Sequence, residues 1–81
     1  MYFVYILQSE LNGRFYIGSS DDVPRRLADH NSGNTPSTKP YRPWKLAYKE
    51  PFAAKSEAQK KERLIKSWKN PEYMKKALGF E

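Results

Sequence analysis

The chain has 81 residues, carries a formal net charge of +6, contains 38% hydrophobic residues and has no cysteine. This length allows one domain with one modest core, so we expect residues 1–81 to form a single domain. The lack of cysteine excludes a disulfide scaffold, a thiolate metal site and cysteine catalysis. The basic balance favours a polyanionic partner, most often nucleic acid, although a merely solubilising surface would carry the same charge.

No segment of the sequence predicts a membrane span or a secretory signal. The apolar runs fall well short of the roughly 18 residues that a membrane span needs. The apolar stretch that starts at Tyr2 is short and lacks the basic lead of a signal peptide. We therefore expect a soluble, cytoplasmic protein with no membrane partner.

The N-terminal residues predict a β-hairpin. Tyr2 to Leu7 is almost wholly apolar and rich in aromatic and β-branched residues, which is typical of a strand covered on both faces. Asn12-Gly13 favours a type I′ turn, in which both central residues need positive φ. Arg14 to Ser19 would then be the return strand.

Tyr5 and Tyr16 are expected to lie on one face of this hairpin. A turn centred on Asn12-Gly13 pairs residues whose numbers sum to 25, which places Tyr5 opposite Ser20. A looser loop with a sum of 21 would place the two tyrosines directly opposite each other. Every odd sum keeps them on the same face, because side-chain direction alternates along a strand.

A helix, a loop and a third strand are predicted next. Asp21-Asp22 before a Val-Pro pair indicates a helix start, and Gly33 would end that helix. Residues 33–43 form a long polar loop, and loops of that length tend to be functional or mobile. Trp44 to Tyr48 alternates large apolar residues with Lys and Ala, which indicates a strand with one wet face.

Two helices complete the predicted order β-β-α-β-α-α, an α+β fold with a small, mainly antiparallel sheet flanked by helices. The residues 56–59 have the pattern of a capping box and would open a helix that runs to about Asn70. Pro71 breaks this helix, and residues 72–78 would form a short last helix. The expected core stripe of the longer helix consists of Ala58, Leu64, Ile65 and Trp68.

Three groups of polar side chains are candidates for a site. Tyr5 and Tyr16 could act together, although two half-buried strand tyrosines could equally pack their rings. Arg26 and His30 are neighbours at i, i+4 at the edge of the core, although a solvated Arg and a dipole-stabilised helix-terminal His are an ordinary alternative. Glu62 lies near the margin of its helix's apolar stripe, where a carboxylate could ligate Mg²⁺.

Two ion pairs at i, i+4 are expected on the helix surfaces. Glu62 would pair with Lys66, which is the plain alternative to a metal-binding role. Arg25 would pair with Asp29, a surface contact of little energy.

The sequence resembles the GIY-YIG endonucleases in several separated elements that cover residues 2–70. Phe3-Val4-Tyr5 and Tyr16-Ile17-Gly18 look like the paired signature, with Phe3 in place of its Gly. The further matching elements are Arg26-Leu27, the run from His30 to Gly33, Glu57-Ala58, Glu62 and Ile65-Lys66. In this order they are similar to the family's small stand-alone bacterial members.

The resemblance implies a central three-stranded antiparallel sheet and a DNA-cutting site with one divalent cation, Mg²⁺ or Mn²⁺. By position, it implies that Tyr5 and Tyr16 are the active-site phenols, Arg26 the phosphate-directed cation, His30 their accessory and Glu62 the metal ligand. Some members also have an active-site Asn beyond the acid, after a Pro-x-Tyr segment. Here Pro71-Glu72-Tyr73 is followed by Met74, so this element is absent or displaced to Asn70.

We therefore expect a metal-dependent endonuclease that hydrolyses phosphodiester bonds in DNA. Nothing in the chain resembles a separate DNA-reading domain, so we expect a structure-directed enzyme of the repair or recombination type, or one that a protein partner targets. The alternative is a non-catalytic, basic nucleic-acid binding module that stacks bases on Tyr41, Trp44 and Tyr48. A basic structural protein without a nucleic-acid role is a third reading, which retention of nucleic acid at low salt would oppose.

Overall fold

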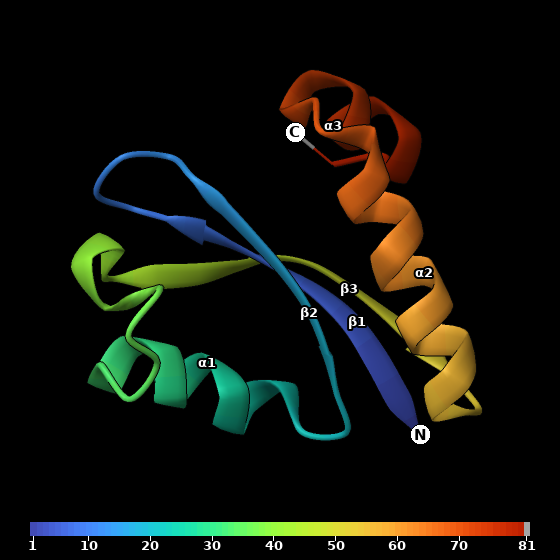
Figure 1. Cartoon of the computed structure of the whole chain (residues 1–81), viewed down its shortest axis with the longest axis horizontal. Coiled ribbons are helices and arrows are strands. Elements are labelled where there is room, and N and C mark those ends of the chain that lie inside the picture. The colour runs from blue at the N-terminus through green and yellow to red at the C-terminus, as the bar shows by residue number, and fades with distance from the viewer. Residues whose placement is uncertain (81) are drawn as a thin grey trace.

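The structure of the chain, a computed structural model, describes residues 1–80. Its centre is a three-stranded antiparallel sheet with the spatial order β2-β1-β3 (Figure 1). Strand β1 spans Tyr2–Ser9, β2 spans Phe15–Ser20 and β3 spans Trp44–Phe52. The third strand is longer than the sequence predicts, and β2 is an edge strand.

The helices are α1 (Val23–Ser32), α2 (Lys55–Trp68) and α3 (Pro71–Leu78), with a short 3-10 helix, η1, at Lys39–Tyr41. The order β-β-α-β-α-α and the antiparallel sheet confirm the predicted α+β fold. Figure 1 shows α1 on one side of β2 and α2 with α3 on the other side. Among residues 1–80, no helix combines the length and the apolar character that crossing a bilayer requires.

The alternating side chains of β1 build two separate cores, one on each face of the sheet. Val4 and Ile6 point toward α2 and α3, where they pack with buried residues of those helices. Tyr5 and Leu7 point toward α1, where they pack with Val23 and other buried or half-buried apolar residues. All four β1 side chains are at most 1% exposed, which confirms the prediction of a strand covered on both faces.

The hairpin turn differs from the predicted type I′ turn. Of the residues in the turn only Gly13 has positive φ, at 80°, whereas a type I′ turn needs two such residues. The Ser9 hydroxyl oxygen accepts from the backbone N–H groups of Leu11 and Asn12, at 3.1 and 3.2 Å. The Ser9 backbone N–H donates to the Arg14 carbonyl at 2.8 Å. The loop is therefore longer than a two-residue turn.

The longer loop shifts the register of the hairpin by two residues from the predicted one. Tyr5 lies opposite Gly18 rather than Ser20, and Tyr16 lies opposite Leu7. The sum of paired residue numbers is 23, which is odd. The prediction that Tyr5 and Tyr16 share a face is confirmed, because it depended on parity and not on the turn type.

The ends of α1 lie where the sequence predicts them. The Asp22 side chain accepts from the Arg25 backbone N–H at 3.1 Å and caps the N-terminus. Gly33 caps the C-terminus with φ at 87°, in the left-handed region that glycine adopts without a Cβ penalty. The first helix is thus defined by its local sequence.

The N-terminus of α2 lies two residues earlier than the sequence predicts. The helix begins at Lys55, with Ala54 as the N-cap in place of Ser56. The predicted capping box of residues 56–59 does not cap the helix; instead, the Glu57 carboxylate accepts from the Ala54 backbone N–H at 3.3 Å. The helix ends at Trp68, because Lys69 adopts a left-handed conformation with φ at 55°.

The predicted core stripe of α2 is correct in part. Ala58 and Ile65 are buried and Trp68 packs half-buried against the same core. Leu64, however, is 49% exposed and does not belong to the core. It borders a shallow surface hollow with Phe52 instead.

Candidate active site

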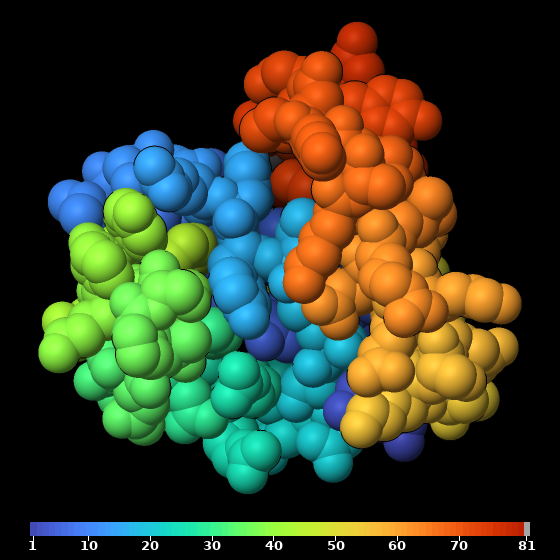
Figure 2. Space-filling view, in the orientation of Figure 1, coloured from blue at the N-terminus to red at the C-terminus, as the bar shows by residue number. Residues whose placement is uncertain are grey.

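The predicted site residues gather around the edge strand β2, but they approach it from two faces of the sheet. Tyr5, Tyr16 and His30 lie on the α1 face, and Arg26 of α1 is close to Tyr5. Glu62 of α2 reaches Ser19 of β2 from the opposite face. Figure 2 shows the surface of β2 lying open between the walls that α1 and α2 form. The edge of β2 is therefore the line where the two groups of side chains can meet.

A hydrogen-bonded chain joins β1, α1 and the loop after α1. The Tyr5 hydroxyl lies 3.5 Å from His30 Nε2, and His30 Nδ1 lies 2.8 Å from Thr38 Oγ1. Thr38 donates its own hydroxyl proton to the Thr35 carbonyl at 3.3 Å. Thr38 must therefore accept from His30 Nδ1–H, which leaves Nε2 as an acceptor for the Tyr5 hydroxyl.

The burial of His30 corrects one alternative reading of the sequence. His30 is fully buried, so it is not a solvated histidine at a helix terminus. Burial lowers the pKa of the imidazole below its ordinary value of 6.5, and the nearby Arg26 lowers it further. The neutral imidazole that results can accept one hydrogen bond and donate another, as the contacts to Tyr5 and Thr38 require.

The two tyrosines pack as neighbours rather than directly opposite each other. Their ring centroids are 6.3 Å apart, and the Tyr16 ring lies 4.6 Å from the His30 ring. Tyr5 is 1% exposed, whereas Tyr16 is half-buried. The two rings therefore pack against each other, and Tyr16 is the more exposed of the two side chains.

Gly18, the last residue of the second motif half, makes room for Tyr5. A Cβ atom at Gly18 would lie 2.7 Å from the Tyr5 hydroxyl oxygen and 2.8 Å from Tyr5 Cζ. It would also lie 3.2 Å from Cε2 of Tyr16. The φ angle of Gly18 is not positive, so the glycine is required by this close approach and not by backbone conformation.

Arg26 is the cation nearest to the phenols. It is half-buried, and its guanidinium forms an ion pair with Asp29 at 3.5 Å. The predicted partner of Asp29 was Arg25, so the structure replaces the i, i+4 pair with an i, i+3 pair. Burial raises the pKa of the Tyr5 phenol, and the Arg26 guanidinium opposes this effect without cancelling it. Tyr5 therefore remains a protonated phenol near neutral pH.

Glu62 is held by two hydrogen bonds at the edge of β2. The Ser19 hydroxyl donates to one carboxylate oxygen and the Lys66 ammonium donates to the other, both at 2.7 Å. The predicted ion pair between Glu62 and Lys66 is therefore present. The Glu62 side chain is 19% exposed, and its charge contributes to the raised pKa of Tyr5 from across the strand.

The donor set around Glu62 fits a hydrated divalent cation with a single carboxylate ligand. Within residues 1–80, no three side chains of His, Cys, Asp or Glu gather closely enough to hold a metal ion. Mg²⁺ is commonly bound by one or two carboxylates and otherwise by water and substrate phosphate oxygens. A cation at Glu62 would compete with the exposed ammonium of Lys66, a pair of modest strength.

Asn70, the possible displaced active-site amide, has a structural role. Its side-chain oxygen accepts from the backbone N–H groups of Glu72 and Tyr73, at 3.0 and 3.2 Å, and so caps α3. The amide oxygen is therefore engaged at the junction of α2 and α3. The contacts at Asn70 explain its position without catalysis.

The aromatic residues cited for a base-stacking module do not form one surface. Trp44 is 4% exposed and packs in the α1 core, whereas Tyr48 packs with the α2 and α3 core. A register shift in the pairing of β1 with β3 lies between them and reverses the side-chain direction. The prediction that β3 alternates regularly and has one solvent-exposed face is therefore wrong at the register shift, between Leu46 and Tyr48.

Comparisons with known proteins assign the chain to a class of nucleases. The family model described as the GIY-YIG catalytic domain matches residues 1–77. The chain therefore belongs to the GIY-YIG family. It has a nuclease-type fold, this domain implies a nucleic-acid substrate, and nucleases of the family generally use a divalent metal.

The chain is also similar to several UPF0213 proteins. The UPF0213 protein of Streptococcus pneumoniae serotype 4 is 42% identical over 71 residues, which cover 86% of this chain and 71% of that protein. The UPF0213 protein SERP0126 of Staphylococcus epidermidis is 39% identical over 75 residues, which cover 91% and 90%. The NMR structure of the UPF0213 protein BH0048 from Bacillus halodurans matches with a TM-score of 0.59 and 30% identity, over 98% of this chain and 84% of that chain.

Sequence reasoning did not identify the roles of three residues that contact the candidate site residues. Thr38 fixes the tautomer of His30, Ser19 fixes Glu62, and Gly18 admits Tyr5. The long polar loop at residues 33–43 was a signal for Thr38, since loops of that length are often functional. The contact between Ser19 and Glu62 joins residues 43 positions apart, and no local pattern indicates it.

Proposed function

We propose that the protein is a metal-dependent endonuclease that hydrolyses phosphodiester bonds in DNA. The observation that carries this proposal is the convergence of five side chains at the edge of β2 in a chain of the GIY-YIG family. These side chains are Tyr5, Tyr16, Arg26, His30 and Glu62. Hydrolysis of a phosphodiester needs a positioned water, a neutralised phosphate and a stabilised leaving oxygen, and this set contains groups suited to each task.

Arg26 is proposed to bind the non-bridging oxygens of the scissile phosphate. Its planar guanidinium can donate two parallel hydrogen bonds to such oxygens. The ion pair with Asp29 at 3.5 Å holds the side chain beside the phenols and is weak enough to yield to a phosphate.

Tyr16 is proposed to orient and deprotonate the attacking water. It is half-buried and reaches solvent, whereas Tyr5 is buried and carries a phenol whose pKa is raised. Tyr5 would instead act as a hydrogen-bond donor that His30 holds in place through Nε2. A free tyrosine is a poor base at neutral pH, so the proposed mechanism depends on the positive charge of Arg26 beside the phenols.

Glu62 is proposed to hold one Mg²⁺ or Mn²⁺ ion. When bound, such an ion supplies Lewis-acid polarisation of the phosphate and stabilises the charge on the leaving oxygen. Ser19 would keep one oxygen of Glu62 oriented while the other exchanges Lys66 for the cation. Removal of the cation by a chelator should therefore stop cleavage.

The substrate is proposed to be DNA with a local structure such as a nick, a flap or a branch, as in repair or recombination. The catalytic domain matches residues 1–77, and these residues would recognise the DNA around the cut. Selection would then come from the shape of the DNA or from a protein partner that targets the enzyme. A cytoplasmic location fits this role.

A panel of branched, nicked, single-stranded and duplex substrates tests this function. We expect the wild-type protein to cut at least one structured DNA with Mg²⁺ or Mn²⁺ and to lose this activity with EDTA. The Glu62→Ala variant should stay folded, as judged by circular dichroism, and should not cut. Unchanged cleavage by purified Glu62→Ala would overturn the mechanism.

A non-catalytic nucleic-acid binding module remains the second candidate, favoured by the net charge of +6. It predicts binding that a chelator does not change, together with no cleavage of any substrate in the panel. The separation of Trp44 from Tyr48 removes the stacking surface on which this reading depended.

A further inference from the structure

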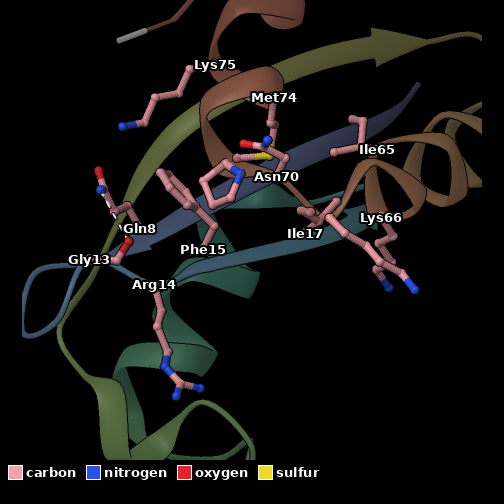
Figure 3. A pocket seen from close by; sticks show the side chains of 12 residues that line it. Gln8, Gly13, Arg14, Phe15, Ile17, Ile65, Lys66, Asn70, Met74 and Lys75 are labelled. Carbon is pink, nitrogen blue, oxygen red and sulfur yellow. Dashed lines mark hydrogen bonds between the residues drawn. The ribbon is translucent and has the colours of Figure 1, made fainter.

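A second concave site lies beside the proposed active site, between β2 and the junction of α2 with α3. Its cavity volume is about 570 Å³, within the range of pockets that hold small ligands. Phe15 and Ile17 of β2 and Met74 of α3 form its apolar lining. Figure 3 shows Phe15 facing Met74 and Asn70 across this pocket.

The polar part of the lining is basic. Lys66, Lys69 and Lys75 line the pocket, and none of its lining residues is acidic. Arg14 also borders it, but its guanidinium lies over the Tyr41 ring, 4.6 Å from the centroid. Lys66 and Lys75 pair with Glu62 and Glu72, at 2.7 and 3.6 Å, and a phosphate would have to compete with these carboxylates. Basic groups around an apolar surface complement a ligand that has both an apolar ring and negative charge.

Lys69 occupies a position where glycine would be the more stable residue. It is the C-cap of α2 with φ at 55°, a left-handed conformation that costs a residue with a Cβ about 1 kcal/mol or more. The side chain is exposed and lines the pocket, and Lys69 forms no ion pair with the acidic residues of the described part of the chain. A lysine at this strained position therefore has no structural explanation within residues 1–80.

Phe15 offers a ring for stacking at the wall of the pocket. It is half-buried, and its ring packs edge-to-face with the Phe80 ring, with the two ring centroids 6.2 Å apart. Lys75 Nζ lies 5.7 Å from the centre of the same ring. An aromatic ring beside an ammonium group is the arrangement that binds a base together with its phosphate.

The pocket is aligned with the proposed metal ligand along β2. Phe15, Ile17 and Ser19 alternate onto the α2 face, and Ser19 is the residue that holds Glu62. The four residue steps from Phe15 to Ser19 span about 13 Å. This is close to four stacked nucleotides of a duplex strand, which rise about 3.4 Å each. Lys66 belongs to both sites, since it lines the pocket and donates to Glu62.

We propose that this pocket binds an unpaired nucleotide of the DNA strand that is cut, about four nucleotides from the scissile phosphate. The base stacks on Phe15, and the adjoining phosphates lie against Lys66, Lys69 and Lys75. This inference rests on the proposed endonuclease function and narrows its substrate to DNA with a single-stranded segment near the cut. Fully paired DNA would leave the pocket empty, because its bases stay in the helix.

Fluorescence anisotropy with a labelled single-stranded oligonucleotide in EDTA tests the pocket without cleavage. Phe15→Leu keeps an apolar residue but removes the ring, and should weaken binding by about 5-fold or more. Lys69→Gly removes the charge at a position that suits glycine. It should reduce the magnitude of the slope of log affinity against log salt concentration by about one, as expected for one lost phosphate contact. Lys76→Ala is the control, since Lys76 is an exposed lysine of α3 that does not line the pocket.

Binding of fully duplex DNA should change little in Phe15→Leu. Single-stranded binding by Phe15→Leu and Lys69→Gly that equals wild type, or an equal loss for duplex and single strands, would overturn the proposal. Lys69→Gly should melt at or above the wild-type temperature, so its result cannot be attributed to unfolding.

The two proposals fail in different experiments. Glu62→Ala should abolish cleavage while it keeps single-stranded binding in EDTA, whereas Phe15→Leu should weaken binding in EDTA. Loss of the nuclease function alone would leave the anisotropy results intact. Loss of the pocket alone would leave Mg²⁺-dependent cleavage sensitive to Glu62→Ala but with no preference for unpaired DNA.

Discussion

Replacement of Gly18 by alanine tests how closely the phenols are packed at the edge of β2. The new Cβ would lie 2.7 Å from the Tyr5 hydroxyl oxygen and 2.8 Å from Tyr5 Cζ. Tyr5 is 1% exposed and is enclosed by the α1 core, so its ring cannot swing aside freely. Overpacking of this kind costs about 1–3 kcal/mol in the free energy of unfolding.

For a domain of this size, such a cost lowers the melting temperature by about 4 to 24 °C. We expect Gly18→Ala to show this loss in a thermal melt followed by circular dichroism. Cleavage should fall as well, because a displaced Tyr5 can no longer keep its 3.5 Å contact with His30 Nε2.

The same substitution in a Tyr5→Phe background is the matched control. Tyr5→Phe removes the hydroxyl oxygen, which is the closest atom, but leaves Cζ at 2.8 Å. Gly18→Ala should therefore cost less in this background than in the wild type, and the double-mutant cycle should give a coupling of 0.5 kcal/mol or more, as is typical for residues in contact. An unchanged melting temperature in Gly18→Ala, or an equal cost in both backgrounds, would refute the steric explanation.

Further predictions concern the titration of His30, the hydrogen bond that fixes it and the pair at Glu62. Because burial lowers the pKa of His30 below 6.5, the unfolded chain binds more protons at acid pH. The stabilisation by neutral His30 is fully present above about pH 6.5, and below this pH it falls by at most about 1.4 kcal/mol per pH unit. In urea unfolding, the free energy of unfolding of His30→Gln should therefore change less with pH over this range than that of the wild type. Thr38→Val removes the acceptor for His30 Nδ1–H and should destabilise the protein by about 1–3 kcal/mol, whereas a melt equal to wild type would contradict the tautomer. Lys66→Met should lower the Mg²⁺ concentration for half-maximal cleavage by about two-fold at saturating DNA, in keeping with an exposed i, i+4 pair, and a higher requirement would oppose competition at Glu62.

The fold was predictable where the alternation of side chains along a strand, or a helix cap formed by neighbouring residues, determines the structure. Side-chain direction alternates along a strand, and the sum of paired residue numbers is odd. These two facts were enough to place Tyr5 and Tyr16 on one face. The caps of α1 follow from Asp22 and Gly33, whose own side chain or backbone freedom supplies the geometry. These features depend on residues close in sequence.

Features that depend on competition between contacts were not predictable. The hairpin register follows from the Ser9 hydroxyl, which holds two backbone N–H groups of the loop and overrides the turn preference of Asn12-Gly13. The opposite faces of Trp44 and Tyr48 follow from a register shift against β1, which the alternating sequence conceals.

The arrangement of the candidate site residues was not predictable from the sequence. The family resemblance identified the same five residues that the structure gathers around β2, but it did not indicate that Glu62 approaches from the face opposite Tyr5. The sequence also did not separate the roles of the two phenols: burial raises the pKa of Tyr5, which favours Tyr5 as a hydrogen-bond donor. Such electrostatic roles depend on tertiary packing.

The most direct test of the account is the single-turnover rate at which wild-type protein and Glu62→Gln cut the best structured DNA substrate in Mg²⁺. Glu62→Gln keeps the size of the side chain and can still accept from Ser19, but it removes the charge that would hold the cation. We expect a loss of at least about 100-fold, together with an unchanged melting profile. Cleavage by Glu62→Gln at the wild-type rate would contradict a metal-dependent site at the edge of β2.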